Sequence, residues 1–286
     1  MTDRGSVELV DFGDAARLER FGDRLVDRPN PGATGTRRYP EAWRDADLRF
    51  DRDGGWTSSG VADGAGSGPW LVPIDGLAMQ LRPTDAGQVG LFPEHAEMLP
   101  WLRDRVKERI KDGAPAPAVL HLFAYTGLAT LAMAHAGAAV AHVDSARPTV
   151  AWARRNAESS GLADHPVRWI VDDARGFTER ESRRHRRYVG VVLDPPTYGH
   201  GAGGRAWRIE TDLEPLLAGC RQLMEPGGSV LLTAHTPSLG PDDLGAILVR
   251  SMGLPHKAVE VGELGLTATD GRRLELGAFA RSAGTA

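Results

Sequence analysis

Residues 118 to about 252 alternate short apolar runs with longer amphipathic ones, which is the pattern of repeated β–α units. The apolar runs predict five strands, at 119–123, 139–143, 167–171, 188–193 and 229–233. The intervening patterns predict helices at 128–136, 148–160, 174–180, 209–224 and 242–252. Helical crossovers join parallel strands, so we expect a parallel sheet with helices on both faces. Segments 258–261 and 274–279 predict a terminal hairpin around Asp270-Gly271.

Residues 1–88 show a different pattern, with short apolar stretches such as 7–10 and 70–74 separated by turn formers. This pattern predicts a small β-rich module that precedes a larger domain at 89–286. The low-complexity segment 60–68 predicts a mobile loop. A helix is expected at 93–109, where Pro93 suits the first turn.

Composition narrows the function classes. The chain has 286 residues, 41% of them apolar and 25% charged, which is typical of a globular protein. A net charge of -4 means that any nucleic-acid partner requires a local basic patch. One cysteine, Cys220, excludes an internal disulfide and a multi-cysteine metal site, and we predict no metal site. No signal peptide or membrane span is apparent, so we expect a cytoplasmic protein.

Ligands of such sheets bind beyond the carboxyl ends of the strands, near the point where the strand order reverses. After the first strand come Phe123, Ala124, Tyr125, Thr126 and Gly127, where Gly127 permits a tight turn into a helix. A dinucleotide fingerprint requires glycine where Tyr125 and Thr130 stand. The loop therefore suits a carboxylate better than a pyrophosphate, unless it is only a generic turn.

Carboxylates follow the second and third strands. Asp144, with Ser145 beside it, could accept both hydrogens of a ribose diol or could cap the next helix. Asp173 could accept an adenine amino hydrogen or could likewise cap a helix. We prefer Asp173 to Asp172 because it directly precedes the small Ala174.

The fourth strand ends in Asp194-Pro195-Pro196-Thr197-Tyr198. The two prolines fix φ and remove two N–H donors, which leaves rigid carbonyl acceptors beside a carboxylate. This set suits a flat amine or heterocycle that stacks on Tyr198 and is hydrogen-bonded by Asp194 and the Pro195 carbonyl. The alternative is that the prolines only end the strand.

Four segments together, at 120–127, 143–144, 173–174 and 193–196, resemble the class I S-adenosylmethionine (SAM)-dependent methyltransferases, in particular the branch of bacterial 23S ribosomal RNA methyltransferases. The resemblance covers about residues 88 to 280. Residues 90–95 resemble a segment that precedes the core in one bacterial subgroup, in which the last residue is commonly Gln rather than His95.

The resemblance implies a Rossmann-like fold, with a seven-stranded, mostly parallel sheet and a terminal antiparallel hairpin. It also implies that residues 123–127 cradle the methionine part of SAM, that Asp144 holds the ribose and that Asp173 holds the adenine. The segment 194–198 would face the methyl acceptor. SAM has a carboxylate and no pyrophosphate, which agrees with the missing glycines.

The position of the cysteine bears on which atom of the base accepts the methyl group. Methylation of pyrimidine carbon-5 requires a cysteine adduct, and Cys220 lies on the apolar face of a predicted helix, as core cysteines do. Cytosine-C5 members of the resembled group carry a cysteine after strand five, where this chain has Thr233-Ala234-His235-Thr236. A base nitrogen is therefore expected. His235 could act as a base, contact substrate or be structural.

The predicted function is methylation of a nucleobase, most simply in ribosomal RNA. Arginines at 183, 184, 186 and 187, and a basic run at 103–111, could meet phosphates or could be solvated helix faces. The loop 199–204, followed by Arg205 and Arg208, could close over substrate. Alternatives are a small-metabolite or protein methyltransferase, and an inactive SAM-binding module that associates with RNA. A nicotinamide dehydrogenase is disfavoured by the missing glycines.

Overall fold

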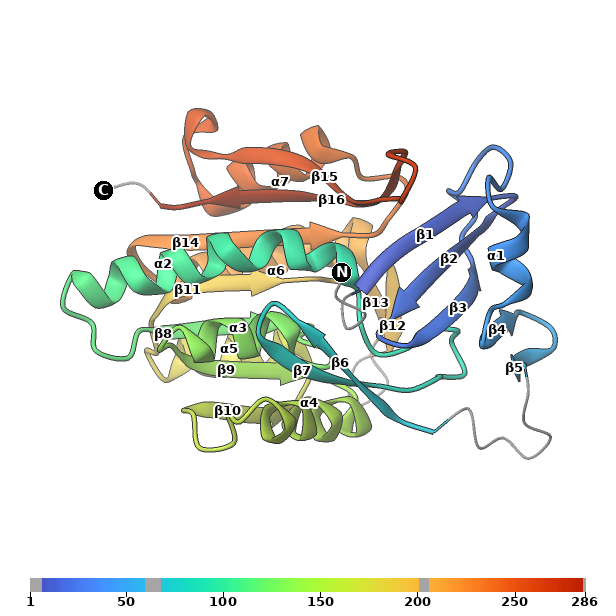
Figure 1. Cartoon of the computed structure of the whole chain (residues 1–286). Helices are drawn as coiled ribbons and strands as arrows, with labels where there is room; N and C mark the ends of the chain where they lie inside the picture. Colours follow the sequence, from blue (N-terminus) through green and yellow to red (C-terminus); the bar gives the residue numbers. More distant parts are fainter. Residues whose placement is uncertain (1–6, 60–67, 201–205, 285–286) are drawn as a thin grey trace. The chain divides into compact units, whose positions relative to one another are not determined.

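The computed structural model describes residues 7–59, 68–200 and 206–284 (Figure 1). The chain divides into two compact units, 1–96 with 265–276 and 97–264 with 277–286. We expected the boundary at residue 88, whereas this division leaves residues 89–96 with the first unit. The Arg82 N–H donates to the Val89 carbonyl (3.0 Å) across the expected boundary. Most of the loop predicted at 60–68 lies outside the described residues.

The first unit is rich in short strands, as predicted. Its five-stranded sheet has the order β1-β2-β3-β4-β5, with strands β1 (Val7–Gly13), β2 (Ala16–Phe21), β3 (Arg24–Pro29), β4 (Leu48–Asp51) and β5 (Gly55–Ser58). A short helix α1 (Pro40–Arg44) and a hairpin of β6 (Trp70–Ile74) and β7 (Leu77–Leu81) complete it. The buried Asp11 carboxylate accepts hydrogen bonds from Trp43 Nε1 (2.8 Å) and the Tyr39 N–H (2.9 Å), which ties α1 to the sheet.

A seven-stranded sheet has the order β10-β9-β8-β11-β14-β16-β15, and all of it except residues 265–267 and 273–276 belongs to the second unit. The strands are β8 (Ala118–Leu122), β9 (Ala139–Asp144), β10 (Val167–Val171), β11 (Tyr188–Leu193), β14 (Met224–Ala234), β15 (Glu260–Thr267) and β16 (Arg273–Ser282). Strands β8 to β11 and β14 are parallel, and β16 is antiparallel to β14. The predicted Rossmann-like sheet with a terminal hairpin is therefore confirmed, and its order reverses between β8 and β11.

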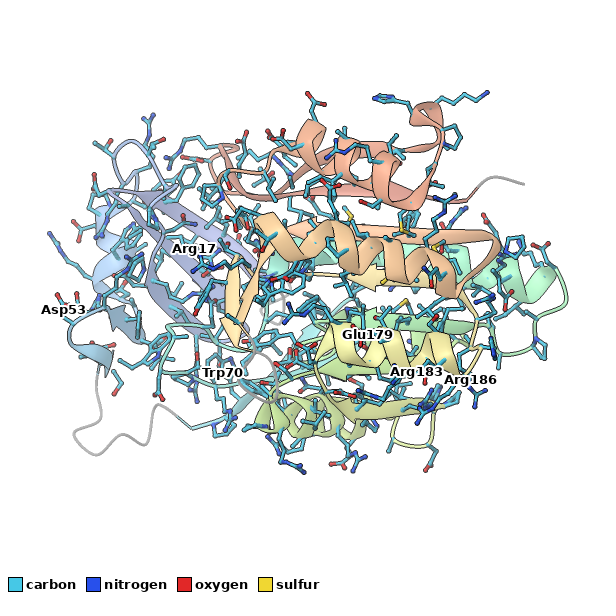
Figure 2. All side chains as sticks on the ribbon, turned by 180° about the vertical axis from the view of Figure 1, so that it is seen from behind. Arg17, Asp53, Trp70, Glu179, Arg183 and Arg186 are labelled. Atoms are coloured by element: carbon cyan, nitrogen blue, oxygen red, sulfur yellow. The ribbon has the colours of Figure 1, made fainter. Side chains whose placement is uncertain are left out.

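Helices cover both faces of this sheet. Figure 1 shows α2 (Leu99–Lys111), α3 (Leu128–His135) and α4 (Arg147–Ser159) on the near face. Seen from behind in Figure 2, α5 (Ala174–Arg183), α6 (Ile209–Leu223) and α7 (Pro241–Met252) lie on the other face. Apolar side chains such as Leu120, Val191, Leu217 and Leu232 form the core, and each contributes about 1.5–3 kcal/mol on burial.

Several local features differ from the predictions; the strand expected at 229–233, for example, is the longer β14. The expected helix at 93–109 is divided into a 3-10 segment η2 (Pro93–Met98) and the α-helix α2, because Pro100 has no N–H to donate and occupies the first turn of a new helix. A small hairpin of β12 (Tyr198–His200) and β13 (Ala206–Arg208) follows the proline pair and was not predicted. In the described part of the chain, no helix is long and apolar enough to cross a membrane.

Candidate active site at the carboxyl ends of the central strands

A pocket in the second unit lies at the carboxyl ends of β8, β9, β10 and β11. It is lined by Phe123, Val143, Asp144, Ser145, Asp172, Asp173, Ala174, Pro196, Gly199 and Trp207. Several predicted cofactor residues and one predicted acceptor residue, Pro196, therefore share one pocket. Parallel strands that end at one edge of a sheet explain why segments so distant in sequence converge there.

The loop from Phe123 to Gly127 has an unusual backbone. Phe123 (φ +54°) and Tyr125 (φ +49°) adopt the left-handed region, as does Gly127 (φ +93°). A Cβ at Gly127 would lie 3.2 Å from the Cβ of Ala153, so the turn into α3 has little room for a side chain. Left-handed backbone is costly for residues other than glycine and is concentrated at ligand sites.

Neighbouring segments hold this loop in place. The Ala124 N–H donates to the Val143 carbonyl (3.1 Å), and Nδ2 of the buried Asn156 donates to the Thr126 carbonyl (2.9 Å). The loop is thus anchored to β9 and to α4. Anchoring from two sides offsets the backbone strain and preorganises the free N–H groups at the start of α3.

Asp144 joins two loops. Its Oδ2 accepts a hydrogen bond from the Tyr125 N–H (3.0 Å), and its Oδ1 accepts one from the Ala146 N–H (2.9 Å). Helix α4 begins at Arg147 after Ala146, without a side-chain cap, so Asp144 does not serve as the helix cap that was the alternative. Burial raises the pKa of Asp144. Each carboxylate oxygen retains a second lone pair for a ligand hydroxyl.

The two carboxylates after β10 have different partners. Asp173 is the N-cap of α5, because its Oδ1 accepts hydrogen bonds from the N–H groups of Arg175 and Gly176 (3.1 Å each). Asp172 accepts a hydrogen bond from the Asp173 N–H (2.9 Å) and forms an ion pair with Arg180. Asp172 is thus paired with Arg180, and Asp173 Oδ1 also lies 3.6 Å from Arg175 Nε, which leaves Asp173 Oδ2 as the acceptor beside the pocket.

The segment after β11 is fixed to the end of β14. The Thr233 hydroxyl donates to Asp194 Oδ1 (2.7 Å), and His235 Nε2 lies 3.6 Å from the same oxygen. The hydroxyls of Thr197 and Thr236 lie 2.8 Å apart. Asp194, Pro195 and Pro196 therefore form a rigid corner, at which the Asp194 carboxylate and the His235 imidazole lie next to each other.

Trp207 is a lining residue that the sequence interpretation missed. It is buried, its Nε1 donates to the Pro196 carbonyl (2.7 Å), and its ring centroid lies 4.9 Å from that of Phe123. The signal in the sequence that could have identified Trp207 is an aromatic residue soon after the glycine-rich segment 199–204. Tyr198 is 52% exposed, and the Arg208 guanidinium lies 5.8 Å from its ring. Residues 201–205, with Arg205 and much of the predicted closing loop, lie outside the described residues.

Cys220 is located in the core. Its side chain is fully buried in α6, and burial raises its pKa to about 12. It does not line the pocket. A thiol with this pKa remains protonated at neutral pH and is a poor nucleophile.

Two buried histidines, His121 and His142, contact the first turn of α3, which follows the loop 123–127. The Thr130 hydroxyl is 2.7 Å from His121 Nδ1 and 2.9 Å from His142 Nδ1. One hydroxyl hydrogen can serve only one of these nitrogens, so the other imidazole must donate its own Nδ1–H. This network fixes the first turn of α3 on β8 and β9.

The strand order and the strand-end pocket define a Rossmann-like methyltransferase fold. The profile of the S-adenosylmethionine-dependent methyltransferase family matches residues 62–258. The chain belongs to this family, and its cofactor is SAM.

Solved structures agree with this assignment. A SAM-dependent methyltransferase from Agrobacterium tumefaciens is 32% identical, covers 97% of this chain and 90% of its own, and superimposes with a TM-score of 0.89. The structure of SMU.776, complexed with SAH, is 15% identical and has a TM-score of 0.74, which shows the shared fold over 98% of this chain and 76% of its own.

Curated relatives are longer proteins. The ribosomal RNA large subunit methyltransferase K/L of Magnetococcus marinus is 31% identical over 168 residues, or 58% of this chain and 22% of the relative. The protein of the same name from Methylococcus capsulatus is 36% identical over 118 residues, or 41% of this chain and 16% of the relative. The chain thus matches about a fifth of these relatives' length.

Proposed function

We propose that this protein transfers the methyl group of SAM to a base nitrogen in ribosomal RNA of the large subunit, in the cytoplasm. The rigid corner of Asp194, Pro195 and Pro196, which adjoins the strand-end pocket, is the observation that carries the proposal. The names of the curated relatives support RNA as the substrate.

In this proposal the pocket holds SAM along the strand ends. The carboxylate of its methionine part meets the N–H groups at the start of α3, reached through residues 123–127. Asp144, with Ser145 beside it, accepts the ribose hydroxyls, and Asp173 Oδ2 accepts the adenine amino group over Ala174. The second lone pairs of Asp144 and the uncapped oxygen of Asp173 fit these donors. SAM supplies an electrophilic methyl carbon on a positively charged sulfur.

The corner positions the acceptor. Asp194 and the Pro195 carbonyl accept the hydrogens of a base amine, and Tyr198, which is half exposed, offers a ring for the base to stack on. Methyl transfer is an in-line displacement, so alignment is the main task of the protein. Positioning of this kind contributes about 7–11 kcal/mol.

The residues near the corner favour nitrogen over carbon as the acceptor. Carbon-5 methylation requires a thiolate that adds to the base. Cys220 is buried with a raised pKa, and the end of β14 offers Thr233 and His235 instead. We therefore propose transfer without a cysteine adduct, in which Asp194, with His235 beside it, accepts the proton that the base nitrogen loses as it gains the methyl group.

The test is transfer of tritium from labelled SAM into unmodified 23S rRNA, assembled subunits, protein and metabolite pools. We expect label in RNA, and digestion to nucleosides then identifies the methylated atom. Label confined to metabolites or protein contradicts the RNA assignment. SAM binding without any transfer points to the inactive RNA-associated module. Asp194→Ala is the control, because transfer that depends on the corner should be lost in this variant.

A further inference from the structure

A second cavity opens at the amino ends of the same strands. It has a volume of about 500 Å³ and is lined by Ala118, Ala139, Val140, Ala141, His165, Pro166, Val167, Arg168, Arg186, Arg187 and Tyr188. We call it the amino-edge groove. Strand β11 has six residues, so the groove lies about 20 Å from the corner at Asp194. It is therefore distinct from the candidate active site.

The groove carries an excess of positive charge. Arg168, Arg186 and Arg187 line it, and among the described lining residues none is acidic. Arg186 and Arg187 are exposed, and the side chain of Arg168 is 53% exposed. Arg187 already donates one hydrogen bond to the Gln222 carbonyl, but each guanidinium carries five N–H groups, and those that remain can form paired hydrogen bonds with phosphate oxygens.

The adjacent negative charge is buried and already compensated. The Glu181 side chain is 1% exposed, accepts a hydrogen bond from the Tyr188 hydroxyl (2.5 Å), and lies 3.5 Å from Arg168 and 3.1 Å from Arg184. Because Glu181 is buried and lies next to Arg168, it orients that arginine without presenting a carboxylate to a ligand. Repulsion of an anion at the groove is correspondingly small.

The floor of the groove is apolar. Ala118 and Ala139 line it at the first positions of β8 and β9, and Ala141 lines it at the third position of β9, with Val140 and Val167 beside them. Small apolar side chains below a cationic rim match a nucleotide, whose sugar and base present flat apolar surface and whose phosphate carries the charge. Cavities of this size accommodate ligands of that class.

The cationic surface continues past the groove along the chain. Figure 2 shows Arg183 at the end of α5 and Arg186 just beyond it, with Glu179 about one turn earlier in the helix. All three side chains are exposed. An RNA strand that enters the groove would thus meet Arg183 as it leaves, and the exposed carboxylate of Glu179 bounds this cationic surface further along α5.

We propose that the amino-edge groove binds the phosphate backbone of the RNA substrate at a distance from the methylated base. The proposal rests on RNA being the substrate. At 3.4 Å per nucleotide along a helical strand, 20 Å corresponds to about six phosphates, but β11 is buried, so an RNA that contacts both places follows the surface around the sheet and spans more than six. A folded RNA element can therefore occupy both places, with one contact for affinity and the other for chemistry.

Arg186 offers the cleanest test, because its side chain is exposed and its removal leaves Glu181 compensated by Arg168 and Arg184. The variants are Arg186→Gln and Arg186→Glu, and the matched control is Arg154→Gln, which removes an exposed arginine of α4 outside the groove. Binding of fluorescein-labelled fragments of unmodified 23S rRNA is followed by anisotropy across a series of KCl concentrations. SAH binding by calorimetry and the thermal unfolding midpoint report on the fold.

We expect R186Q to weaken RNA binding about three- to tenfold and to reduce the slope of log affinity against log salt by about one, as for one lost phosphate contact. R186E should weaken binding further, whereas R154Q should behave like the wild type. KM for RNA should rise while kcat and SAH affinity stay unchanged. Wild-type affinity and slope in both Arg186 variants would overturn the groove assignment while leaving the proposed methylation intact.

The two proposals fail separately. RNA binding that depends on Arg186, without methyl transfer to any RNA, supports the groove and contradicts the proposed function. A wild-type protein that does not bind RNA overturns both. Titration with AMP distinguishes RNA from a free nucleotide as the ligand of the groove. If R186Q weakens AMP binding and leaves RNA binding unchanged, the groove binds a free nucleotide instead.

Discussion

The Oδ2 atom of Asp144 accepts a 3.0 Å hydrogen bond from the backbone N–H of Tyr125, 19 residues earlier in the chain. This bond joins the end of β9 to the strained loop after β8. It holds Asp144, which is predicted to bind the ribose, and the loop 123–127, which is predicted to bind the methionine part, in one arrangement before any ligand arrives. A site preorganised in this way loses little entropy on binding.

We expect Asp144→Ala to weaken SAH binding about tenfold to a hundredfold, the effect of losing a hydrogen bond to a charged acceptor. Asp144→Asn retains one acceptor oxygen and should lose less. Isothermal titration calorimetry measures both, and thermal unfolding shows whether the loop has loosened. Unchanged affinity in folded Asp144→Ala would exclude the ribose role.

Asp194→Ala should reduce methyl transfer about a hundredfold or more, because misplacing a reacting atom by about 1 Å has an effect of this size. SAH affinity should stay close to that of the wild type. Thr233→Val removes the hydroxyl that donates to Asp194 Oδ1 and should have a smaller effect in the same direction. Single-turnover transfer to RNA is the measurement, and full activity of Asp194→Ala would reject the acceptor role.

Cys220→Ala should retain methyl transfer within about twofold, because a buried thiol with a raised pKa does not form the adduct that carbon methylation requires. The native protein should also resist thiol reagents until it is unfolded. A folded Cys220→Ala protein without activity would instead indicate carbon-5 chemistry.

His142 makes stability depend on pH. It is fully buried between the Thr130 hydroxyl and the Trp169 ring, and burial, with the nearby His121, lowers its pKa well below 6.5. The unfolded chain therefore binds a proton below pH 6.5 that the folded protein does not bind. The free energy of unfolding should fall by up to about 1.4 kcal/mol per pH unit as the pH drops below 6.5 towards the folded pKa.

Urea denaturation at several pH values, with the wild type and His142→Gln compared, isolates this contribution. Glutamine can still bond to Thr130 but does not titrate in this range. The variant should show a shallower dependence on pH than the wild type. Equal slopes would show that His142 does not control acid stability.

Local patterns predicted most of the fold. The strand at 167–171 and that at 188–193 have the predicted bounds, and the helix starting at Ile209 begins where expected. Apolar periodicity and glycine or proline at element ends are properties of neighbouring residues, so they can be detected without an alignment. Pro100 carried such a signal as well, but the apolar stripe around it dominated the interpretation.

By itself, the sequence determined the order of strands and helices and the polar residues that follow each strand, because both depend on neighbours along the chain. Only the tertiary structure decided which of these residues meet. The contacts of Asp172 with Arg180, Pro196 with Trp207 and Asp194 with Thr233 link different elements. Arginines 168, 186 and 187 line one cavity because parallel strands bring segments 18 and 19 residues apart to the same edge of the sheet.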